Sequence, residues 1–377
     1  MTRIFYTFRD SPPRRNALAA PVGAPERYLL FGLDELRARG HDVRHNLERA
    51  RPPAWAREAG RASRWGLERA GGYGGDFATV YASLGEAGRA EVVVSTVDTV
   101  GIPLLLLKRA GRLSPPLVYV AVGLPERLAL LRGRRMRRLY ASALARASTV
   151  VAYSEHEAEE LERWVAAHGE RARTAFVPFG VRTDVLVPAT RRAELDVVSV
   201  GADPHRDYEL LVRVAEAMPD RSFRLVAAAD RLRSLTRLPR NVSVEVELAF
   251  EEMLERLRAA RVVALPVREN SYSGATTVLL QAMALGKPVV VSRTQAISNG
   301  YGLVDGDNCR LVPPGDPETF ARALRDVLGD DLRARALGGS ARITVERELG
   351  WDRYVDRLEE LILDAAATSA RARPGRG

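Results

Sequence analysis

The stretch SYSGATTVLLQAMALGKPVVVS, residues 271–292, is the part of the sequence that decides the fold. It begins as a loop of small and hydroxyl residues, continues as a helix that stops at Gly286, and ends as a buried strand. Small residues in a row are an odd choice for packing, but they let backbone N–H groups approach an anion closely. The stretch therefore predicts a phosphate-binding loop within an α/β unit.

Composition places the chain among globular proteins. Its 377 residues suffice for two domains, and the hydrophobic content of 46% with 28% charged residues is typical of folded proteins. The longest strongly apolar stretch, 99–107, is too short to span a bilayer. The start MTRIFYTFRD is strand-like and does not resemble a signal peptide. The single cysteine, Cys309, excludes an internal disulfide and a cysteine-built metal site. We expect a cytoplasmic protein.

The positive charge is unevenly distributed. Residues 1–185 contain 29 Arg or Lys and 20 Asp or Glu, whereas residues 186–377 contain 28 of each. The excess is densest at RGRRMRR, residues 132–138. This run is either a solvated helix face or a patch facing an anionic acceptor or the inner membrane surface, as a peripheral contact. No nucleic-acid reader motif accompanies it, so we expect no nucleic-acid partner.

Short apolar runs alternate with amphipathic helical stretches, which predicts α/β units with parallel sheets. The predicted strands are 3–8, 91–96, 117–122, 149–153, 195–200, 223–228, 242–246, 262–266 and 288–292. The predicted helices include 25–39, a helix that starts with a capping box at Ser154–Glu157, and 351–363. The segment 51–75 shows no clear strand, and we interpret it as a mobile helix-loop insertion.

The pattern restarts near residue 180, after FVPFGVRTDVLVP (176–188). We therefore predict an N-terminal domain at 1–185 and a C-terminal domain at 186–350. The helix 351–366 is expected to pack back on the first domain, and 367–377 to be a disordered tail. Two doubly wound, Rossmann-like domains facing a central cleft would bind ligands at their strand ends.

The loop GADPHRDY, residues 201–208, follows the first strand of the second domain. Gly201 allows a tight turn, and Arg206 is expected at the opening of a helix, where N–H groups attract phosphate. His205 would add a donor whose charge depends on pH. The alternative is that Asp203 only caps the helix and that Arg206 is solvated.

A second loop of this kind is the opening stretch itself. Gly274 would permit close approach of a ligand to the N–H groups at the helix start. The alternative is that Ser273 is only an N-cap. Two such loops on adjacent crossover units favour a shared nucleoside diphosphate. The remaining candidate binding residues in this loop are Ser271, Ala275, Thr276 and Thr277.

The second half resembles the donor-binding domain of GT-B glycosyltransferases, in particular family 4 of retaining enzymes. The matching segments are VPFGVRTDVLVP, VSVGADPHRDYELL, SGATTVLLQAMALGKPVVVS and GYGLVDGDNCRLVPPGDPETFARAL, which cover most of 176–328. The first half matches more loosely, through LDELRARGHDV and STVVAYSEHEAEEL. The resemblance implies a GT-B fold, in which 1–185 is the acceptor-binding domain and 186–350 the donor-binding domain. It also implies an enzyme that transfers a sugar with retention. The donor would be a UDP- or GDP-sugar, and the acceptor hydroxyl would belong to a small molecule, a glycan or a lipid-linked compound.

The sequence departs from the family at several positions. Two glutamates eight positions apart, which bind sugar and ribose in many members, are replaced by Ser273 and Gln281. Gln281 can still bond a ribose hydroxyl, and Glu269 could reach the sugar from upstream. The position that is commonly basic in the family, just after the glycine of the first loop, is Ala202 here. The histidine that often follows the strand near residue 120 is also absent. These departures raise the alternative of a non-catalytic GT-B protein that acts as a binding partner or activator.

We assign catalysis to Arg206 and Ser273, because they sit in the two loops that would hold the leaving group. No cofactor and no metal are expected, since helix N-termini and arginine can neutralise a departing diphosphate. The triplet Asp305-Gly306-Asp307 is interpreted as a turn and not as a metal-binding motif.

Overall fold

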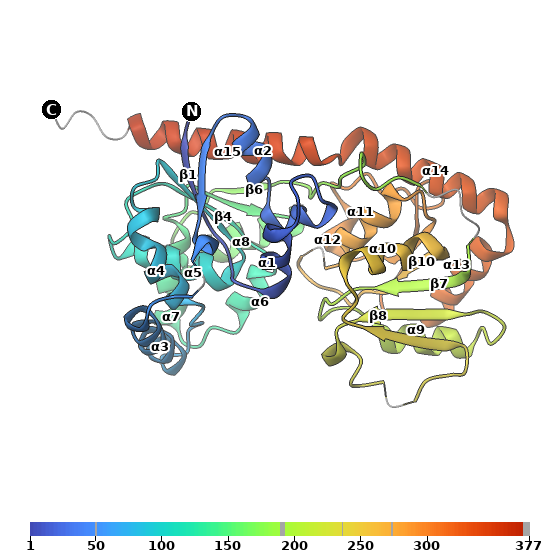
Figure 1. Cartoon of the computed structure of the whole chain (residues 1–377). Helices are drawn as coiled ribbons and strands as arrows, with labels where there is room; N and C mark the ends of the chain where they lie inside the picture. The colour runs from blue at the N-terminus through green and yellow to red at the C-terminus, as the bar shows by residue number, and fades with distance from the viewer. Residues whose placement is uncertain (50, 189–192, 236, 273, 372–377) are drawn as a thin grey trace. The chain divides into compact units, whose positions relative to one another are not determined.

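The computed structural model describes residues 1–49, 51–188, 193–235, 237–272 and 274–371. The chain divides into two compact units, which we call unit 1 (Met1–Val177 with Val355–Gly377) and unit 2 (Pro178–Tyr354). Each unit contains one six-stranded sheet (Figure 1). Every strand pairing in both sheets is parallel, which confirms the predicted α/β class with two doubly wound sheets.

The sheet of unit 1 has the strand order β2-β1-β3-β4-β5-β6. Its strands are β1 (Arg3–Thr7), β2 (Asp42–His45), β3 (Val92–Thr96), β4 (Leu117–Val120), β5 (Thr149–Ala152) and β6 (Thr174–Phe176). The central strands are almost fully buried, because helices cover both faces of a parallel sheet. The chain passes from β1 to β2 and then returns beyond β1 to β3, so that the strand order reverses between β1 and β3.

The helices of unit 1 are α1 (Pro12–Ala19), η1 (Pro25–Leu30), α2 (Leu33–Ala38), η2 (Asn46–Glu48), α3 (Ala54–Arg69), α4 (Phe77–Ala87), α5 (Asp98–Arg109), α6 (Leu124–Ala129), α7 (Arg134–Leu144), α8 (Glu155–Ala166) and most of α15 (Trp351–Arg371). The predicted single helix 25–39 is wrong. Phe31 and Gly32 have φ of 51° and 79°, which separate the 3-10 helix η1 from α2.

The helix α15 is longer than predicted. Its buried stripe continues through Leu358 and Ile362 to Ala365, and this packing keeps the chain helical as far as Arg371. The prediction that 367–377 is a disordered tail is therefore wrong for residues 367–371. Residues 372–377 lie outside the described part of the chain. Among the described residues, no helix combines the length and the apolar character needed to cross a membrane.

The sheet of unit 2 has the strand order β12-β11-β10-β7-β8-β9. Its strands are β7 (Leu195–Val200), β8 (Phe223–Ala227), β9 (Val242–Val246), β10 (Ala260–Leu265), β11 (Val289–Ser292) and β12 (Arg310–Val312). Its helices are α9 (Tyr208–Glu216), η3 (Ala229–Arg231), α10 (Phe250–Ala259), α11 (Thr276–Ala284), α12 (Gln295–Ser298), α13 (Pro317–Gly329) and α14 (Asp331–Glu348). The strand order reverses between β7 and β10, so the loops after these two strands border the crevice where ligands bind in such sheets.

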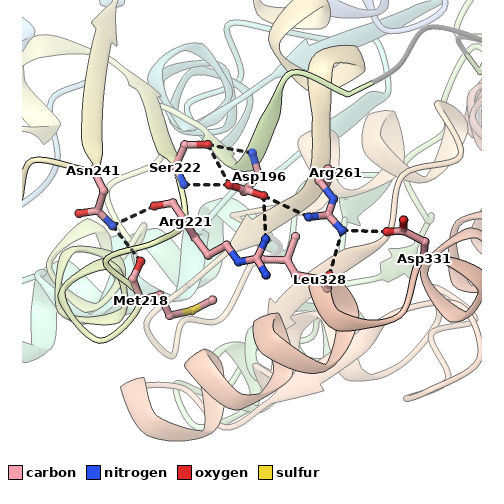
Figure 2. Close-up of polar contacts among 8 residues, drawn as sticks. All are labelled: Asp196, Met218, Arg221, Ser222, Asn241, Arg261, Leu328 and Asp331. Atoms are coloured by element: carbon pink, nitrogen blue, oxygen red, sulfur yellow. Dashed lines mark hydrogen bonds and ion pairs between the residues drawn. The ribbon is translucent and has the colours of Figure 1, made fainter.

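A polar network fastens the amino end of the unit 2 sheet (Figure 2). The Asp196 carboxylate, near the start of β7, accepts hydrogen bonds from the Ser222 backbone N–H at 3.0 Å and from the Arg261 guanidinium at 3.2 Å. Arg261 also donates to the carbonyl of Leu328 at 2.9 Å and to the carboxylate of Asp331 at 2.8 Å. The network joins β7, β10 and α14 at the amino ends of the strands. The candidate residues lie at the other end of the sheet, after the carboxyl ends of β7 and β10.

Candidate functional site

Two loops lie side by side at the point where the strand order of unit 2 reverses. We call them the first loop (201–207, after β7) and the second loop (266–275, after β10). The Arg268 backbone N–H donates to the His205 carbonyl at 2.8 Å, and a second backbone bond of 3.0 Å runs in the other direction. The two loops predicted from sequence to share a ligand are thus held together by the backbone.

Arg206 is the unusual residue of the first loop. It is only 4% exposed, and neither Nε nor Nη1 has a hydrogen-bond partner among the described residues. The guanidinium lies against Gly201, where a Cβ would come within 2.5 Å of Arg206 Nε. Burial lowers the pKa of Arg206, although a guanidinium remains charged in proteins. A buried cation with unpaired N–H groups calls for an anion as its partner.

Asp203 occupies the space in front of Gly274. Its Oδ1 accepts a hydrogen bond from the His205 backbone N–H at 2.8 Å, and its Oδ2 accepts one from the Tyr272 hydroxyl at 2.6 Å. A Cβ on Gly274 would come within 2.7 Å of Asp203 Oδ1. Gly274 is not among the residues with positive φ, so the need for glycine here is one of space. A carboxylate from the first loop therefore rests directly on the second loop.

Helix α11 carries buried polar atoms that have no partner among the described residues. Thr276 is 3% exposed and Gln281 is 4% exposed, and Thr276 Oγ1 and Gln281 Oε1 have no hydrogen-bond partner among the described residues. Ala275, itself buried, occupies the N-cap position and offers no side-chain acceptor to the first turn. Ser273 lies outside the described residues. Such buried polar groups ordinarily find a partner in a ligand or water.

The remaining predicted site residues have definite places. Ser271 is buried, Thr277 is half-buried, and the His205 ring lies edge-on to the Tyr272 ring with their centroids 5.6 Å apart. The Glu269 carboxylate accepts a hydrogen bond from the Gln295 backbone N–H at 2.8 Å, at the start of α12. Glu269 thus stabilises a neighbouring helix.

The alternative interpretation of the first loop is wrong in both parts. The helix α9 begins two residues after Arg206, and it is capped by Asp207, whose Oδ1 accepts from the Leu210 backbone N–H at 3.1 Å. Asp203 therefore does not cap the helix, and Arg206 is buried, not solvated. The sequence prediction that Arg206 opens the helix is wrong as well, because it precedes the cap.

The triplet 305–307 forms a turn before β12. Asp305 Oδ1 accepts from the Leu311 backbone N–H at 2.9 Å and from Arg310 Nε at 3.2 Å, and Gly306 has φ of 81°. Within the part of the chain that the structure describes, no group of three His, Cys, Asp or Glu side chains could hold a metal ion. Burial raises the pKa of the Cys309 thiol to about 12, so this side chain is a packing residue.

Unit 1 contains polar groups at the corresponding edge of its own sheet. Thr7 ends β1 and lies in register with Ser95 of β3, and Thr96 follows. All three side chains are fully buried, and their hydroxyl oxygens have no partner among the described residues. His45 Nδ1, at the end of β2, is also buried and has no partner among the described residues. Burial lowers the pKa of His45 to about 4. These groups border the point where the strand order of unit 1 reverses.

Two buried carboxyl groups lie at the ends of the neighbouring strands. Glu157 Oε1 accepts backbone N–H bonds from Gly123 at 2.7 Å and Leu124 at 3.2 Å, whereas its Oε2 has no partner among the described residues. Asp98 accepts from the Tyr119 hydroxyl at 2.6 Å and from Arg127 Nε at 3.3 Å. Burial, with a contribution from Asp98, raises the pKa of Glu157 to about 8.

Sequence reasoning missed this pair. Ser154 does accept the Glu157 backbone N–H at 2.9 Å, as the predicted capping box requires. The Glu157 side chain also bonds the loop after β4, which the capping-box pattern does not predict. Asp98 follows Val97, which has φ of 62°, a strained value for a β-branched residue. No local pattern signals either contact, because both depend on the pairing of distant strands.

Residues 194–330 match the family described as "Glycosyl transferases group 1". The chain is 27% identical over 232 residues to a GDP-mannose-dependent monoacylated alpha-(1-6)-phosphatidylinositol monomannoside mannosyltransferase of Corynebacterium glutamicum. It is 29% identical over 262 residues to a D-inositol 3-phosphate glycosyltransferase of Xylanimonas cellulosilytica. The matches cover 54% and 62% of this chain, and 59% and 60% of the two relatives. The chain thus matches about three fifths of the length of these relatives.

Solved structures extend the similarity to nearly the whole chain. Sucrose-phosphate synthase from Thermosynechococcus elongatus has a TM-score of 0.72 at 18% identity, and the match covers 97% of this chain and 100% of that one. HepE from Anabaena in complex with UDP-glucose has a TM-score of 0.66 at 16% identity, with coverages of 96% and 100%. At these identities the similarity shows the fold alone. The two doubly wound units have the GT-B fold.

Proposed function

We propose that the chain transfers a sugar from a nucleoside-diphosphate sugar to an acceptor hydroxyl, as the match of residues 194–330 to the group 1 glycosyl transferases supports. The observation that carries this proposal is Arg206, a buried cation whose Nε and Nη1 lack partners among the described residues. It stands at the strand-order reversal of unit 2, where doubly wound sheets bind nucleotides. A diphosphate supplies the negative charge that this guanidinium requires.

The donor nucleotide is proposed to be UDP or GDP. One relative is named as GDP-mannose-dependent, and HepE is described in complexes with UDP and UDP-glucose. In the proposed complex Arg206 bonds the diphosphate, and the first turn of α11 faces it with backbone N–H groups. Gln281 Oε1 accepts a hydrogen bond from a ribose hydroxyl, and Thr276 Oγ1 donates one to an oxygen of the nucleotide-sugar. Both atoms are buried and lack a protein partner in the described structure.

The carboxylate that many family members place at position 273 is proposed to come from Asp203. Ser273 replaces the glutamate in the second loop, but the Asp203 carboxylate of the first loop lies against Gly274, the next residue. Tyr272 and His205 hold it there through hydrogen bonds of 2.6 Å and 2.8 Å. A carboxylate in this position accepts hydrogen bonds from sugar hydroxyls. Glu269 is assigned a different role, because its carboxylate accepts the hydrogen bond of the first backbone N–H of α12.

Charge stabilisation is the proposed source of catalysis. As the bond between sugar and diphosphate breaks, the negative charge on the departing oxygen grows, and the guanidinium of Arg206 with the N–H groups of α11 is already in place to meet it. This arrangement supports turnover without a divalent metal. Retention of the anomeric configuration follows from the family resemblance, with the leaving phosphate taking the proton from the acceptor.

Unit 1 is proposed to bind the acceptor, which is a small molecule, a glycan or a lipid-linked compound. The unpartnered hydroxyls of Thr7, Ser95 and Thr96 are suited to a ligand that carries hydroxyl groups. The proposed location is the cytoplasm, with peripheral contact at the inner membrane face through the basic part of unit 1.

A thermal-shift panel of UDP-, GDP-, ADP- and dTDP-sugars tests the proposal, because a ligand that binds only the folded state raises the melting temperature. We expect a UDP- or GDP-sugar to stabilise the protein. The stabilising donor is then incubated with candidate acceptors, and release of the nucleoside diphosphate is followed. Stabilisation without release for any acceptor class would favour the non-catalytic alternative, and no stabilisation by any donor would contradict the proposal.

A further inference from the structure

Helix α3 exposes tryptophan and arginine together. Trp55 is 59% exposed and Trp65 is 65% exposed, whereas Ala56 and Gly60 form the buried side of the helix. Gly60 packs so closely on α4 that a Cβ would come within 2.6 Å of the backbone nitrogen of Ala78. The helix is thus fixed with its small residues inward. Two large aromatic rings therefore face solvent on a helix that also carries four arginines.

Helix α7 adds a block of positive charge. Its sequence, RRMRRLYASAL, contains four arginines and no acidic residue. Met136 and Tyr140 are buried, and the four arginines are exposed. Leu130, just before this helix, is 74% exposed. The arginines of the predicted basic run therefore do lie on a helix face, and an exposed aliphatic side chain accompanies them.

The segment that follows α3 contacts α7 and the residues just before it. The Arg132 backbone N–H donates to the Gly71 carbonyl at 2.8 Å. The Tyr140 hydroxyl of α7 accepts from the Tyr73 backbone N–H at 2.8 Å and donates to the Tyr73 carbonyl at 2.6 Å. Both helices belong to unit 1 (Figure 1). We call the exposed side chains of α3 and α7, together with Leu130, the α3–α7 surface.

A cavity of about 520 Å³ opens between α3 and α4 at this surface. Its lining includes Arg57, Arg61 and Arg64, which are spaced so that they follow one side of α3. Arg64 pairs with Glu68 at 2.7 Å, but Arg57 and Arg61 form no ion pair with any described residue. Apart from a bond of 3.4 Å from Arg61 Nε to the Arg57 carbonyl, the guanidinium groups of Arg57 and Arg61 have no partner among the described residues, so they can bond phosphate oxygens that enter the cavity.

We propose that the α3–α7 surface docks on a bilayer that contains anionic phospholipids, with Trp55, Trp65 and Leu130 inserted at headgroup depth. Charge complementarity supports this partner, because α3 has four arginines against two glutamates and α7 has four against none. Tryptophan rings prefer the membrane interface, where an apolar face and a polar N–H are both satisfied. The inference deepens the proposed function, since docking would bring a lipid-linked acceptor to unit 1.

A bilayer fits this surface better than a nucleic acid does. Arginine and tryptophan could both contact a nucleic acid, but the exposed Leu130 gains nothing from phosphates or bases. Insertion into a headgroup layer buries all three apolar side chains at once and leaves the arginines at the depth of the lipid phosphates. Arg69, whose guanidinium carbon lies 5.5 Å from the centre of the Trp65 ring, shows this combination within one helix.

The test is co-sedimentation of the full chain with vesicles of pure phosphatidylcholine and of phosphatidylcholine with 30% phosphatidylglycerol, chosen as an anionic composition of roughly the bacterial kind. We expect binding to the anionic vesicles only, weakened by high salt. The double variant W55A/W65A, and separately a variant with the four α7 arginines changed to Gln, should each lower the partition coefficient at least about tenfold. A matched control changes the exposed Leu332, Arg333 and Arg335 of α14 to Ala, Gln and Gln, and should bind normally.

Equal binding to both kinds of vesicle, or normal binding by both surface variants, would overturn the proposal. Binding to single-stranded oligonucleotides that exceeds binding to anionic vesicles would overturn it in favour of a nucleic-acid partner. Nucleotide-sugar binding, measured by calorimetry without vesicles, is a separate readout of unit 2. Loss of vesicle binding in the variants with nucleotide binding intact supports the docking surface. Vesicle binding without any nucleotide binding leaves the docking in place and removes the proposed function.

Discussion

Replacing Arg206 by leucine should affect the stability of the fold and the binding of the donor in opposite directions. The wild-type side chain is buried, and its Nε and Nη1 donate to no described residue, so that the folded protein bears the cost of desolvating a charge. Leucine removes this cost and fills part of the same volume. We therefore expect Arg206→Leu to have an equal or higher melting temperature than the wild type, although it weakens the binding of the donor.

The size of the binding effect follows from the two unpaired donors. A hydrogen bond to a charged group contributes about 1.5–3 kcal/mol, so two such bonds to a diphosphate contribute at least about 3 kcal/mol. This corresponds to a loss of about 150-fold in Kd at 25 °C. Arg206→Lys should be intermediate, because it keeps the charge and loses the two-pronged geometry.

Isothermal titration calorimetry with the nucleoside diphosphate measures this loss, and Arg231→Gln is the matched control. Arg231 borders the same loop, but its Nε already donates to the Ala202 carbonyl at 3.0 Å, so its loss should change Kd by less than about threefold. Unchanged affinity in Arg206→Leu, or a loss equal to that of the control, would refute the assignment of Arg206 to the diphosphate.

Gly274→Val should abolish donor binding while the protein still unfolds cooperatively, because its Cβ would displace the Asp203 carboxylate; Ser273→Ala should cost only about 0.5–2 kcal/mol in the same calorimetry. Asp203→Asn should lower kcat/KM for the complete donor more than it lowers affinity for the nucleoside diphosphate alone, and equal effects on both would contradict a sugar contact. Turnover should persist in EDTA, and restoration by magnesium or manganese of activity lost in EDTA would count against a metal-independent reaction. Glu157, whose pKa burial raises to about 8, binds its proton more tightly when folded, so stability should fall as pH rises from about 4.5 to about 8. In urea unfolding at pH 5 and pH 8, Glu157→Gln should remove about 3.5 kcal/mol of that fall, and an unaltered pH dependence would exclude Glu157 as its source.

The sheets were largely predictable because their strands are local and strongly apolar. Strands β7 and β9 have the predicted bounds of 195–200 and 242–246, and most other predicted strands differ from the structure by one or two residues. The helices were harder where backbone geometry intervenes, as at Gly32, which has φ of 79° and where a Cβ would come within 3.3 Å of Val355, far along the chain. Residue 355 cannot be placed against residue 32 from periodicity.

The site was predictable as two loops but not as a set of contacts. The run of small residues in the second loop and Arg206 in the first loop both predicted that an anion binds there. Backbone hydrogen bonds hold the two loops together. The sequence could not show that Arg206 is buried against Gly201 or that Asp203 lies on Gly274, because each contact depends on the packing of loops after different strands. The Asp98–Glu157 pair was missed for the same reason.

Hydrogen–deuterium exchange read by mass spectrometry locates a bound nucleotide-sugar along the chain, and it therefore tests whether the two loops of unit 2 bind the donor. The donor that raises the melting temperature is added at saturation, and exchange is compared peptide by peptide in the wild type and in Arg206→Leu. In the wild type we expect the donor to slow exchange at 201–208 and at the start of α11. In Arg206→Leu this protection should be lost at the same donor concentration. Protection confined to other segments, or protection of the same segments that survives in Arg206→Leu, would contradict it.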